Sequence, residues 1–231
     1  MASAAFPSLP RRAVAEGIGT ALLLATVVGS GIMAERLSGG NAALALLANS
    51  VATGAGLFAL ILAFGSFTGA QFNPVVTLAD AILRNRAWRE VPAYIAAQIL
   101  GAFAGVAAAQ AMFGEPLFAI SHKVRAGLPQ VFAEAVATFG LMAVIFLPRR
   151  GVAEVAAGVG TYIAAAYWFT SSTSFANPAV TLARSVTDTF TGIRPADVPG
   201  FVAGQALGTS AFLLLARWVI PTQDSAGKER R

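Results

Sequence analysis

Residues 73–79 read NPVVTLA and residues 177–183 read NPAVTLA, so one heptapeptide recurs with a single substitution after 104 positions (177 − 73). Asn is a favoured N-cap residue, and Pro suits the first helical position because its missing N–H is not needed there. Each copy therefore predicts the start of a helix. The apolar segment behind each Asn-Pro runs for about ten to twelve residues, or ~15–18 Å of helix. That length reaches half-way across the ~30 Å hydrocarbon core of a bilayer.

The composition of the chain indicates that it lies in lipid. Of its 231 residues, 56% are hydrophobic and 12% are charged, and the mean hydropathy is +0.68. Soluble domains carry roughly 25% charged residues. With no cysteine and one histidine, His122, we expect no disulfide, metal site or cofactor. The basic residues lie in loops beside apolar stretches, where they act as topology signals, so we expect no nucleic-acid partner.

Six apolar stretches are long enough to span a bilayer as helices, for which about 20 residues are needed. They cover about residues 13–34, 42–64, 90–113, 130–147, 152–170 and 198–220. Together with the two half-length segments, they predict an all-α membrane protein of six transmembrane helices and two re-entrant half-helices. The first apolar stretch is interpreted as a retained span and residues 221–231 as a cytoplasmic tail.

The Lys and Arg residues predict the orientation of these helices, because six spans place both termini on one side of the membrane. That side receives eleven basic residues: Arg11, Arg12, Arg84, Arg86, Arg89, Arg149, Arg150, Arg217, Lys228, Arg230 and Arg231. The other side receives five: Arg36, Lys123, Arg125, Arg184 and Arg194. Since cytoplasmic loops carry the excess of Lys and Arg, we expect both termini in the cytoplasm and the protein in the cell inner (plasma) membrane.

The repeat extends well beyond the heptapeptide. AEGIGT (15–20) matches AEAVAT (133–138), and AQILG (97–101) matches GQALG (204–208). Three elements thus recur in the same order in two halves, about 11–113 and 130–220. Each half holds three spans. Because three is odd, the second half must enter the membrane from the opposite side, which predicts an inverted 3+3 repeat.

Inversion brings the two Asn-Pro helix starts together near the middle of the membrane. Each helix start carries roughly half a positive charge, so the facing pair repels cations, hydronium included. The amides of Asn73 and Asn177, released from strict capping by the Pro-led turn, can donate to the oxygen of a passing molecule. A water that accepts both bonds points its hydrogens outward, which interrupts a proton wire. We therefore expect a pore for neutral hydroxylated solutes.

Two Asn-Pro motifs on half-helices within a 3+3 repeat resemble the aquaporin, or major intrinsic protein, family over about residues 11–220. The resemblance implies an aquaporin-like fold, one channel domain over residues 1–231, half-helix dipoles that exclude ions, and a homotetramer with a pore in every protomer. The central barrier would comprise Asn73, Pro74, Val75, Asn177, Pro178 and Ala179. Val75 replaces the usual Ala, and Gln71 replaces a His that many members have.

The largest departure from the family lies at the outer constriction, which usually carries an Arg and aromatic rings. Val180 occupies the position of the Arg, and ungapped offsets from each Asn place Thr53, Ala165 and Ser174 at the other lining positions. None of the four is aromatic or charged. The resemblance then implies a wide filter for solutes bulkier than water: glycerol, urea, or metalloid hydroxides such as arsenite and boric acid. In this the chain looks most like the bacterial aquaglyceroporin-like channels that accompany arsenic-resistance genes.

Two charged residues occupy equivalent positions behind the Asn-Pro motifs, Asp80 and Arg184 (80 + 104). Arg184 lies one turn beyond Val180, and helical side chains lean towards the N-terminus, so Arg184 can supply a displaced positive charge at the outer mouth. The alternative, which the sequence favours, is a solvated interfacial Arg paired with Asp188. We expect Asp80 at the cytoplasmic vestibule.

Glu16 and Glu134 lie within spans, where ionisable residues are usually functional. They are either acceptors for backbone N–H groups of the re-entrant loops, supported by Gln98 and Gln205, or proton relays of an ion-coupled secondary transporter. Their symmetric placement favours the first interpretation. A predominantly water-conducting pore is a further alternative. With no nucleophile–base pair or metal cluster in the sequence, we do not expect an enzyme.

Overall fold

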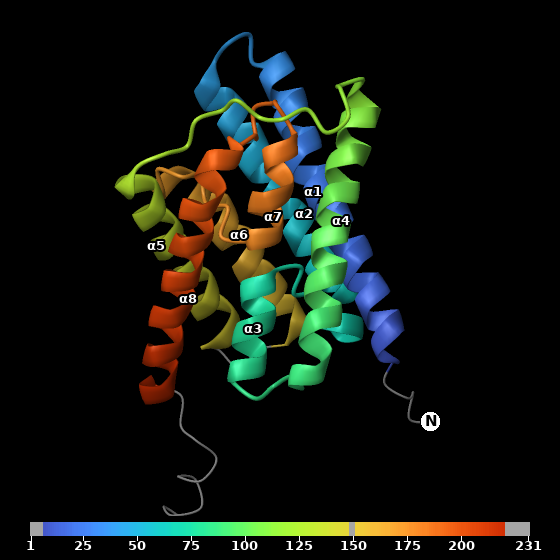
Figure 1. The fold of residues 1–231 in the computed structure, drawn as a ribbon, viewed down its shortest axis with the longest axis vertical. Coiled ribbons are helices and arrows are strands. Elements are labelled where there is room, and N and C mark those ends of the chain that lie inside the picture. The colour runs from blue at the N-terminus through green and yellow to red at the C-terminus, as the bar shows by residue number, and fades with distance from the viewer. Residues whose placement is uncertain (1–6, 148–150, 220–231) are drawn as a thin grey trace, which may run out of the picture.

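The computed structural model describes residues 7–147 and 151–219 (Figure 1). Six helices in this part of the chain are long and apolar enough to cross a membrane. They are α1 (Leu9–Leu37), α2 (Ala42–Thr68), α4 (Val91–Phe113), α5 (Leu128–Phe146), α6 (Val152–Phe169) and α8 (Val198–Val219). The described residues form no strand, so the predicted all-α membrane fold is confirmed. The predicted tail, 221–231, lies outside the described residues.

Two short helices occupy the middle of the bundle, end to end (Figure 1). α3 (Pro74–Ile82) has nine residues, and α7 (Pro178–Ala183) has six before the chain tightens into the 3-10 turn η2 (Arg184–Val186). Both are shorter than the ten to twelve residues expected from the sequence. α3 stops where Arg84 adopts a left-handed φ of 63°, which turns the chain towards η1 (Trp88–Glu90). Neither helix can cross a ~30 Å hydrocarbon core.

The two halves of the chain run in opposite directions (Figure 1). α1 begins at the end of the bundle where α8 finishes, whereas α5 begins near the opposite end. α1 packs against α4 and α2, and α5 packs in the same way against α8 and α6. Contacts between α2 and α6 join the halves. The inverted repeat predicted from the odd number of spans is therefore present in the fold.

The loops that lead into the half-helices repeat each other residue by residue. Three positions in each loop have a positive φ, and the partners are 104 residues apart: Gly69 and Thr173 (93° and 60°), Ala70 and Ser174 (46° and 50°), Phe72 and Ala176 (49° and 48°). Left-handed conformations are unfavourable for residues other than Gly. The five non-Gly residues among them persist only because the surrounding structure holds them there.

Close helix packing within each half depends on Gly. Gly101 and Gly105 on α4 lie against backbone carbonyl oxygens of α1, and Gly204 and Gly208 on α8 lie against those of α5. A Cβ atom at any of these positions would overlap the neighbouring backbone. Small residues at this spacing let transmembrane helices approach closely. The spanning helices can therefore enclose the half-helices tightly.

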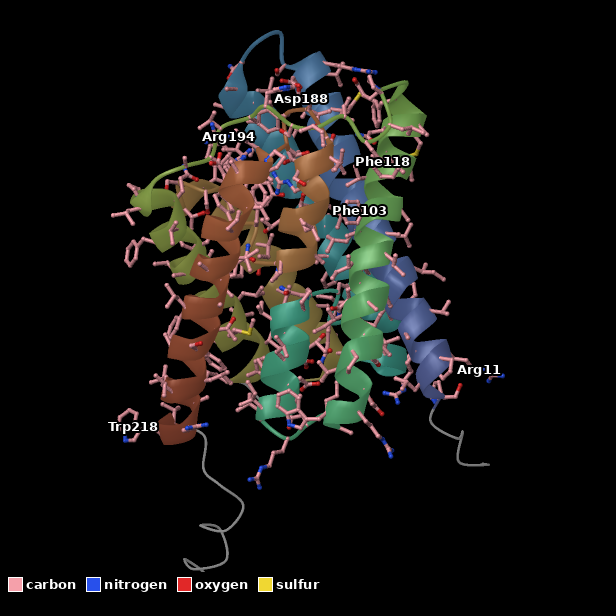
Figure 2. The ribbon with its side chains drawn as sticks, viewed as in Figure 1. Arg11, Phe103, Phe118, Asp188, Arg194 and Trp218 are labelled. Atoms are coloured by element: carbon pink, nitrogen blue, oxygen red, sulfur yellow. The ribbon has the colours of Figure 1, made fainter. Side chains whose placement is uncertain are left out.

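The outside of the bundle is apolar along its length. Leu100 and Leu207 are 71% and 61% exposed, on α4 and α8. Charged and interfacial side chains lie at the ends, with Arg11 and Trp218 at one end and Asp188 at the other (Figure 2). Apolar flanks between polar ends match the layers of a bilayer.

Candidate pore and filter

Each half-helix is capped by the Asn of its own motif. Asn73 and Asn177 have nearly the same extended backbone conformation, with φ/ψ of −153°/119° and −158°/115°. Oδ1 of Asn73 accepts from the N–H of Val75 at 3.1 Å. Oδ1 of Asn177 accepts from the N–H groups of Ala179 and Val180 at 3.0 and 3.3 Å. The expected release of these amides from capping is therefore wrong, because Oδ1 lies over the free N–H groups of the first turn; only the amide nitrogens can serve a solute.

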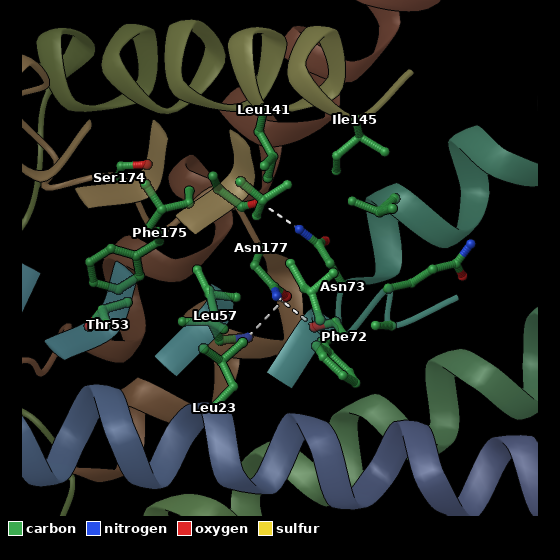
Figure 3. Close-up of a pocket in the computed structure, with 18 of the residues that line it drawn as sticks. Leu23, Thr53, Leu57, Phe72, Asn73, Leu141, Ile145, Ser174, Phe175 and Asn177 are labelled. Carbon is green, nitrogen blue, oxygen red and sulfur yellow. Dashed lines mark hydrogen bonds between the residues drawn. The ribbon is translucent and has the colours of Figure 1, made fainter. Parts of the chain in front are cut away.

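The two caps also hold each other's loops. Nδ2 of Asn73 donates to the carbonyl oxygen of Ala176 at 2.8 Å, and Nδ2 of Asn177 donates to that of Phe72 at 2.8 Å (Figure 3). An amide nitrogen carries two hydrogens, so each Asn keeps one N–H for another partner. Both side chains line the central cavity. The cavity therefore meets two fixed donors where the half-helices face each other.

Glu16 of α1 anchors the first loop. Its side chain is fully buried. The carboxylate accepts from the backbone N–H groups of Gln71 and Phe72 at 3.0 and 2.8 Å. It also accepts from the Thr68 hydroxyl at 2.6 Å and from the Gln98 amide at 3.0 Å. A buried charge is tolerated when hydrogen bonds satisfy it, and here four donors do so.

Glu134 of α5 anchors the second loop in the same way. It is also fully buried, and it accepts from the N–H groups of Phe175 and Ala176 at 2.9 and 2.8 Å and from the Gln205 amide at 2.6 Å. The loop residues that the two carboxylates contact are again 104 positions apart. Neither Glu lines the cavity. Both carboxylates face the loop backbone, away from a solute path.

A cavity of about 220 Å³ passes the two Asn side chains (Figure 3). Its wall is mostly apolar and includes Leu23, Leu57, Ile61, Leu141, Val159 and Ile163. Because α3 and α7 extend away from each other, the lining residues Asp80 and Arg184 mark opposite ends, here called the Asp80 end and the Arg184 end. An apolar wall with a few convergent polar groups is typical of a small-molecule site.

Three of the four predicted filter residues line the cavity: Thr53, Ser174 and Val180. The fourth, Ala165, lies on the exposed face of α6 and does not. Tyr167 lines the cavity instead, with its hydroxyl 3.2 Å from Oγ1 of Thr53. The ungapped offset therefore selected the wrong residue, since helical side chains two positions apart point to opposite sides. The cavity wall beside Thr53 therefore contains an aromatic ring that the offset did not predict.

Arg184 lies inside the protein and lines the cavity. It is 2% exposed, and its guanidinium carbon lies 3.4 Å from the centre of the Phe175 ring. Its Nε donates to the carbonyl oxygen of Thr191. Asp188 pairs instead with Nδ1 of His122 at 2.9 Å. The favoured interpretation of Arg184 as a solvated partner of Asp188 is therefore wrong, because α7 ends at Ala183 and no helix brings the residue four positions on beside Arg184.

Arg125, which the sequence marks only as a basic loop residue, also lies near Phe175. Arg125 belongs to the segment 114–127 between α4 and α5, and its guanidinium carbon lies 5.1 Å from the Phe175 ring centre. Its backbone N–H donates to Oδ2 of Asp197 at 2.8 Å. Burial and the charge of Arg125 lower the pKa of Lys123 in the same segment. In the sequence these are ordinary loop charges, and no pattern marks their place in the folded chain.

Paired half-helices that meet at Asn caps, beside a cavity and inside six spanning helices, define a membrane channel of the aquaporin type. The family model described as Major intrinsic protein matches residues 3–151. The aquaglyceroporin AqpS of Rhizobium meliloti (strain 1021) is 53% identical over 213 residues, which cover 92% of this chain and 91% of that protein. The chain therefore belongs to the major intrinsic protein family, and it is a multi-pass membrane channel.

More distant relatives agree with this assignment. Aquaporin NIP6-1 of Arabidopsis thaliana is 28% identical over 232 residues, covering 97% of this chain and 74% of that protein. The X-ray structure of the aquaglyceroporin from Plasmodium falciparum matches with a TM-score of 0.74 at 21% identity, over 92% of this chain and 97% of that chain. At this identity the match shows the fold alone, and it confirms the aquaporin-like fold.

Proposed function

We propose that the protein is a passive channel for small neutral solutes, namely hydroxylated compounds and urea. Glycerol is the reference solute, and we expect water and metalloid hydroxides such as arsenite to permeate as well. One observation carries this proposal: two Asn N–H donors face a cavity whose wall is mostly apolar. A neutral solute can exchange hydrating water for these donors. An ion would lose a hydration shell that two N–H groups cannot replace, and a cation would also meet two positive helix ends.

The residues at the Arg184 end of the cavity favour the hypothesis that the channel conducts solutes bulkier than water. Val180 presents an alkyl group where the family usually has an Arg. Polar groups line the same cavity. The hydroxyls of Thr53 and Tyr167 pair with each other, and the buried Ser174 Oγ has no hydrogen-bond partner among the described residues. A filter with alkyl and hydroxyl edges suits a polyol, which carries a carbon backbone on one side and hydroxyl groups on the other.

Arg184 supports a displaced barrier to cations. Its charge lies at the cavity wall, held by the Phe175 ring and the Thr191 carbonyl. A buried charge is screened much less than a solvated one. In this proposal Arg184 repels cations as the usual filter Arg would, while Val180 leaves the filter wide.

The second candidate function is an ion-coupled transporter, which would need a carboxylate that binds the coupling ion beside the solute. Glu16 and Glu134 do not suit this role, because their oxygens are occupied by loop N–H groups and neither residue lines the cavity. Uphill solute movement driven by a proton or sodium gradient would nevertheless establish it.

We also propose a homotetramer in the plasma membrane with both termini in the cytoplasm, which makes the Asp80 end cytoplasmic. The larger number of basic residues assigned to that side supports the orientation. Because the chain has no cysteine, single cysteines can report it. Asn85→Cys, beyond α3, should react with an impermeant thiol reagent only from the cytoplasm, and Ala42→Cys, at the start of α2, only from outside. The reverse pattern would refute the orientation.

The function is tested by stopped-flow measurements on proteoliposomes with water, glycerol, urea and arsenite. We expect flux that is linear in the solute gradient and independent of proton and sodium gradients, with glycerol and urea permeabilities well above those of empty liposomes. High water permeability without glycerol, urea or arsenite flux would instead identify a strict water channel. Uphill movement would identify a transporter.

A further inference from the structure

The two half-helices present stripes of equal spacing but opposite charge to the cavity. In the first half the lining residues are the N-cap Asn73 and, on α3, Val76 and Asp80. Their counterparts 104 positions later are the N-cap Asn177, Val180 on α7, and Arg184 directly after α7. Residues three or four and seven positions apart lie on one helix face. The inverted repeat thus places a carboxylate at one end of the pore and a guanidinium at the other.

Each charge has a support two positions before the Asn of its motif. Nε2 of Gln71 donates to Oδ2 of Asp80 at 2.5 Å. In the other half, the Phe175 ring lies against the Arg184 guanidinium. A donor amide is a favourable partner for a carboxylate, and an aromatic face is one for a cation. The Asp80 side chain is therefore held in a fixed position at the cavity wall and is not a solvated surface carboxylate.

Within the described part of the chain, hydrogen bonds reach one oxygen of the Asp80 carboxylate. Gln71 and Nε of Arg86 both donate to Oδ2, at 2.5 and 3.2 Å. Among the described residues, none donates to Oδ1. Gln71 is not free to turn, because its Oε1 accepts from the Thr77 hydroxyl at 2.8 Å. Both oxygens of an ionised carboxylate are acceptors, so the described residues leave Oδ1 of this cavity-lining side chain available to a solute.

Arg86 positions the carboxylate from outside the cavity lining. Its Nη1 donates to Glu90 and its Nη2 to the Thr68 carbonyl, both at 3.2 Å, and its guanidinium carbon lies 3.9 Å from the Tyr94 ring centre. These contacts fix Arg86, and its charge compensates Asp80 from behind. Asp80 is therefore a fixed hydrogen-bond acceptor for a neutral solute more than an open charge that would trap cations.

We propose that Asp80, oriented by Gln71 and Arg86, is a specificity-determining residue that forms a second solute subsite at the Asp80 end. It accepts a hydrogen bond from an N–H or O–H group of a solute whose oxygen points towards the Asn donors, which lie at the start of α3, seven residues earlier. The subsite favours solutes rich in donors, urea above all, since urea has four N–H hydrogens and a single carbonyl acceptor. This inference rests on the proposed channel function.

Asp80→Asn tests the subsite with little change of shape. Gln71 and Arg86 are donors, so the amide oxygen of the variant must take the place of Oδ2, and the NH₂ group takes the place of Oδ1. The free group at the cavity wall thereby changes from an acceptor to a donor. A urea whose carbonyl points towards the positive helix starts offers only N–H groups to position 80, whereas a glycerol hydroxyl or a water can turn and accept.

In proteoliposomes, we expect Asp80→Asn to lower urea permeability about tenfold, the effect of losing one hydrogen bond to a charged acceptor. Glycerol should lose about two- to threefold and water should be unchanged, because both can accept from the new N–H groups. The order of loss is urea, glycerol, water. A steric effect would follow size and reduce glycerol most, so that order, or an unchanged urea-to-glycerol ratio, would overturn the proposal.

The matched control is Arg84→Gln, an exposed charge beyond the end of α3, which should keep the native ratio. Should the Asn variant fail to fold, Asp80→Ser keeps an uncharged acceptor and should lower the urea-to-glycerol ratio about two- to threefold, since a neutral acceptor replaces a charged one; no change in that ratio would again overturn the subsite. Native protein that carries neither urea nor glycerol would refute the channel proposal itself, which separates the two failures.

Discussion

The two re-entrant loops have almost the same backbone and different pore chemistry. Ala70 and Ser174 differ by 4° in φ (46° and 50°), and Phe72 and Ala176 differ by 1° (49° and 48°). At the pore, however, the first half presents Gln71 with Asp80, and the second presents Phe175 with Arg184. The inverted repeat therefore fixes the framework twice and leaves two positions in each half to set the chemistry of its own end.

The two loops share one backbone arrangement because both contain backbone N–H groups that need a hydrogen-bond acceptor. Left-handed turns expose backbone N–H groups that lipid cannot satisfy, and one buried Glu in each half accepts them. No such demand acts on the side chains that face the cavity. They can differ between the halves without loss of the fold.

The largest expected effect tests whether the buried Glu of each half contributes equally to the stability of its re-entrant loop. Glu16→Ala and Glu134→Ala each leave two loop N–H groups and a Gln amide without their acceptor. Breaking a buried charged network costs about 3–5 kcal/mol, so we expect little folded protein from either variant. Thermal unfolding in detergent measures the loss, with exposed Glu35→Ala as the control. A large effect in one half and none in the other would contradict the equivalence.

The next effect concerns the filter at the Arg184 end. Val180→Arg restores the family's usual Arg beside Tyr167, Thr53 and Ser174 and fills space that the valine leaves open. Glycerol permeability should fall about tenfold or more, the discrimination that pocket size typically gives, and water permeability should fall less. Val180→Leu, which adds bulk without charge, is the control. Unchanged glycerol flux through the Arg variant would show that Val180 does not set the filter width.

A smaller effect is expected from the charge at the same end. Arg184→Gln removes the buried cation while keeping a side chain of similar length. We expect a measurable sodium or proton leak across proteoliposomes, because Arg184 is the cation that the described residues place in the cavity lining, and without it the helix dipoles alone oppose cations there. Glycerol permeability should stay near native. A variant with no leak and native solute rates would remove Arg184 from the barrier.

The smallest effect is expected at the exposed pair His122 and Asp188. Hydrogen bonds from the backbone and ring of His122 lower the pKa of Asp188. A carboxylate whose pKa is lowered by folding stabilises the folded state when the pH is above its unfolded-state pKa of ~3.9. This stabilisation is lost as the pH falls through the lower pKa of the folded state. Because the pair is exposed, His122→Ala should cost less than about 1 kcal/mol at pH 7 and nothing in strong acid. Thermal unfolding against pH measures this, and a changed solute permeability would contradict a purely local role.

The half-helices and their inverted arrangement could be predicted from the sequence because the residues that determine them occur once in each half. The Asn-Pro pairs, Glu16 with Glu134, and the odd number of spans were sufficient to predict the half-helices and their inversion. The pore wall was harder. Ala165 was selected by counting along the chain, yet the face of α6 decides which residue reaches the cavity, and that residue is Tyr167.

Arg184 and Arg125 could not be placed from the sequence for a related reason. Arg184 was interpreted as if α7 continued, but the chain tightens into η2 at that residue. Arg125 reaches the Phe175 ring through a long segment without helix or strand. Side-chain positions in such segments depend on tertiary contacts, here with Asp197 and the Gly192 carbonyl, which no local pattern encodes.

The most direct test of the central claim is glycerol flux into proteoliposomes of the native protein, measured at several glycerol gradients with and without an imposed proton gradient. The account predicts a rate proportional to the glycerol gradient, unaffected by the proton gradient and accompanied by no proton current. Glycerol accumulation against its own gradient, or a proton current that follows glycerol flux, would contradict it.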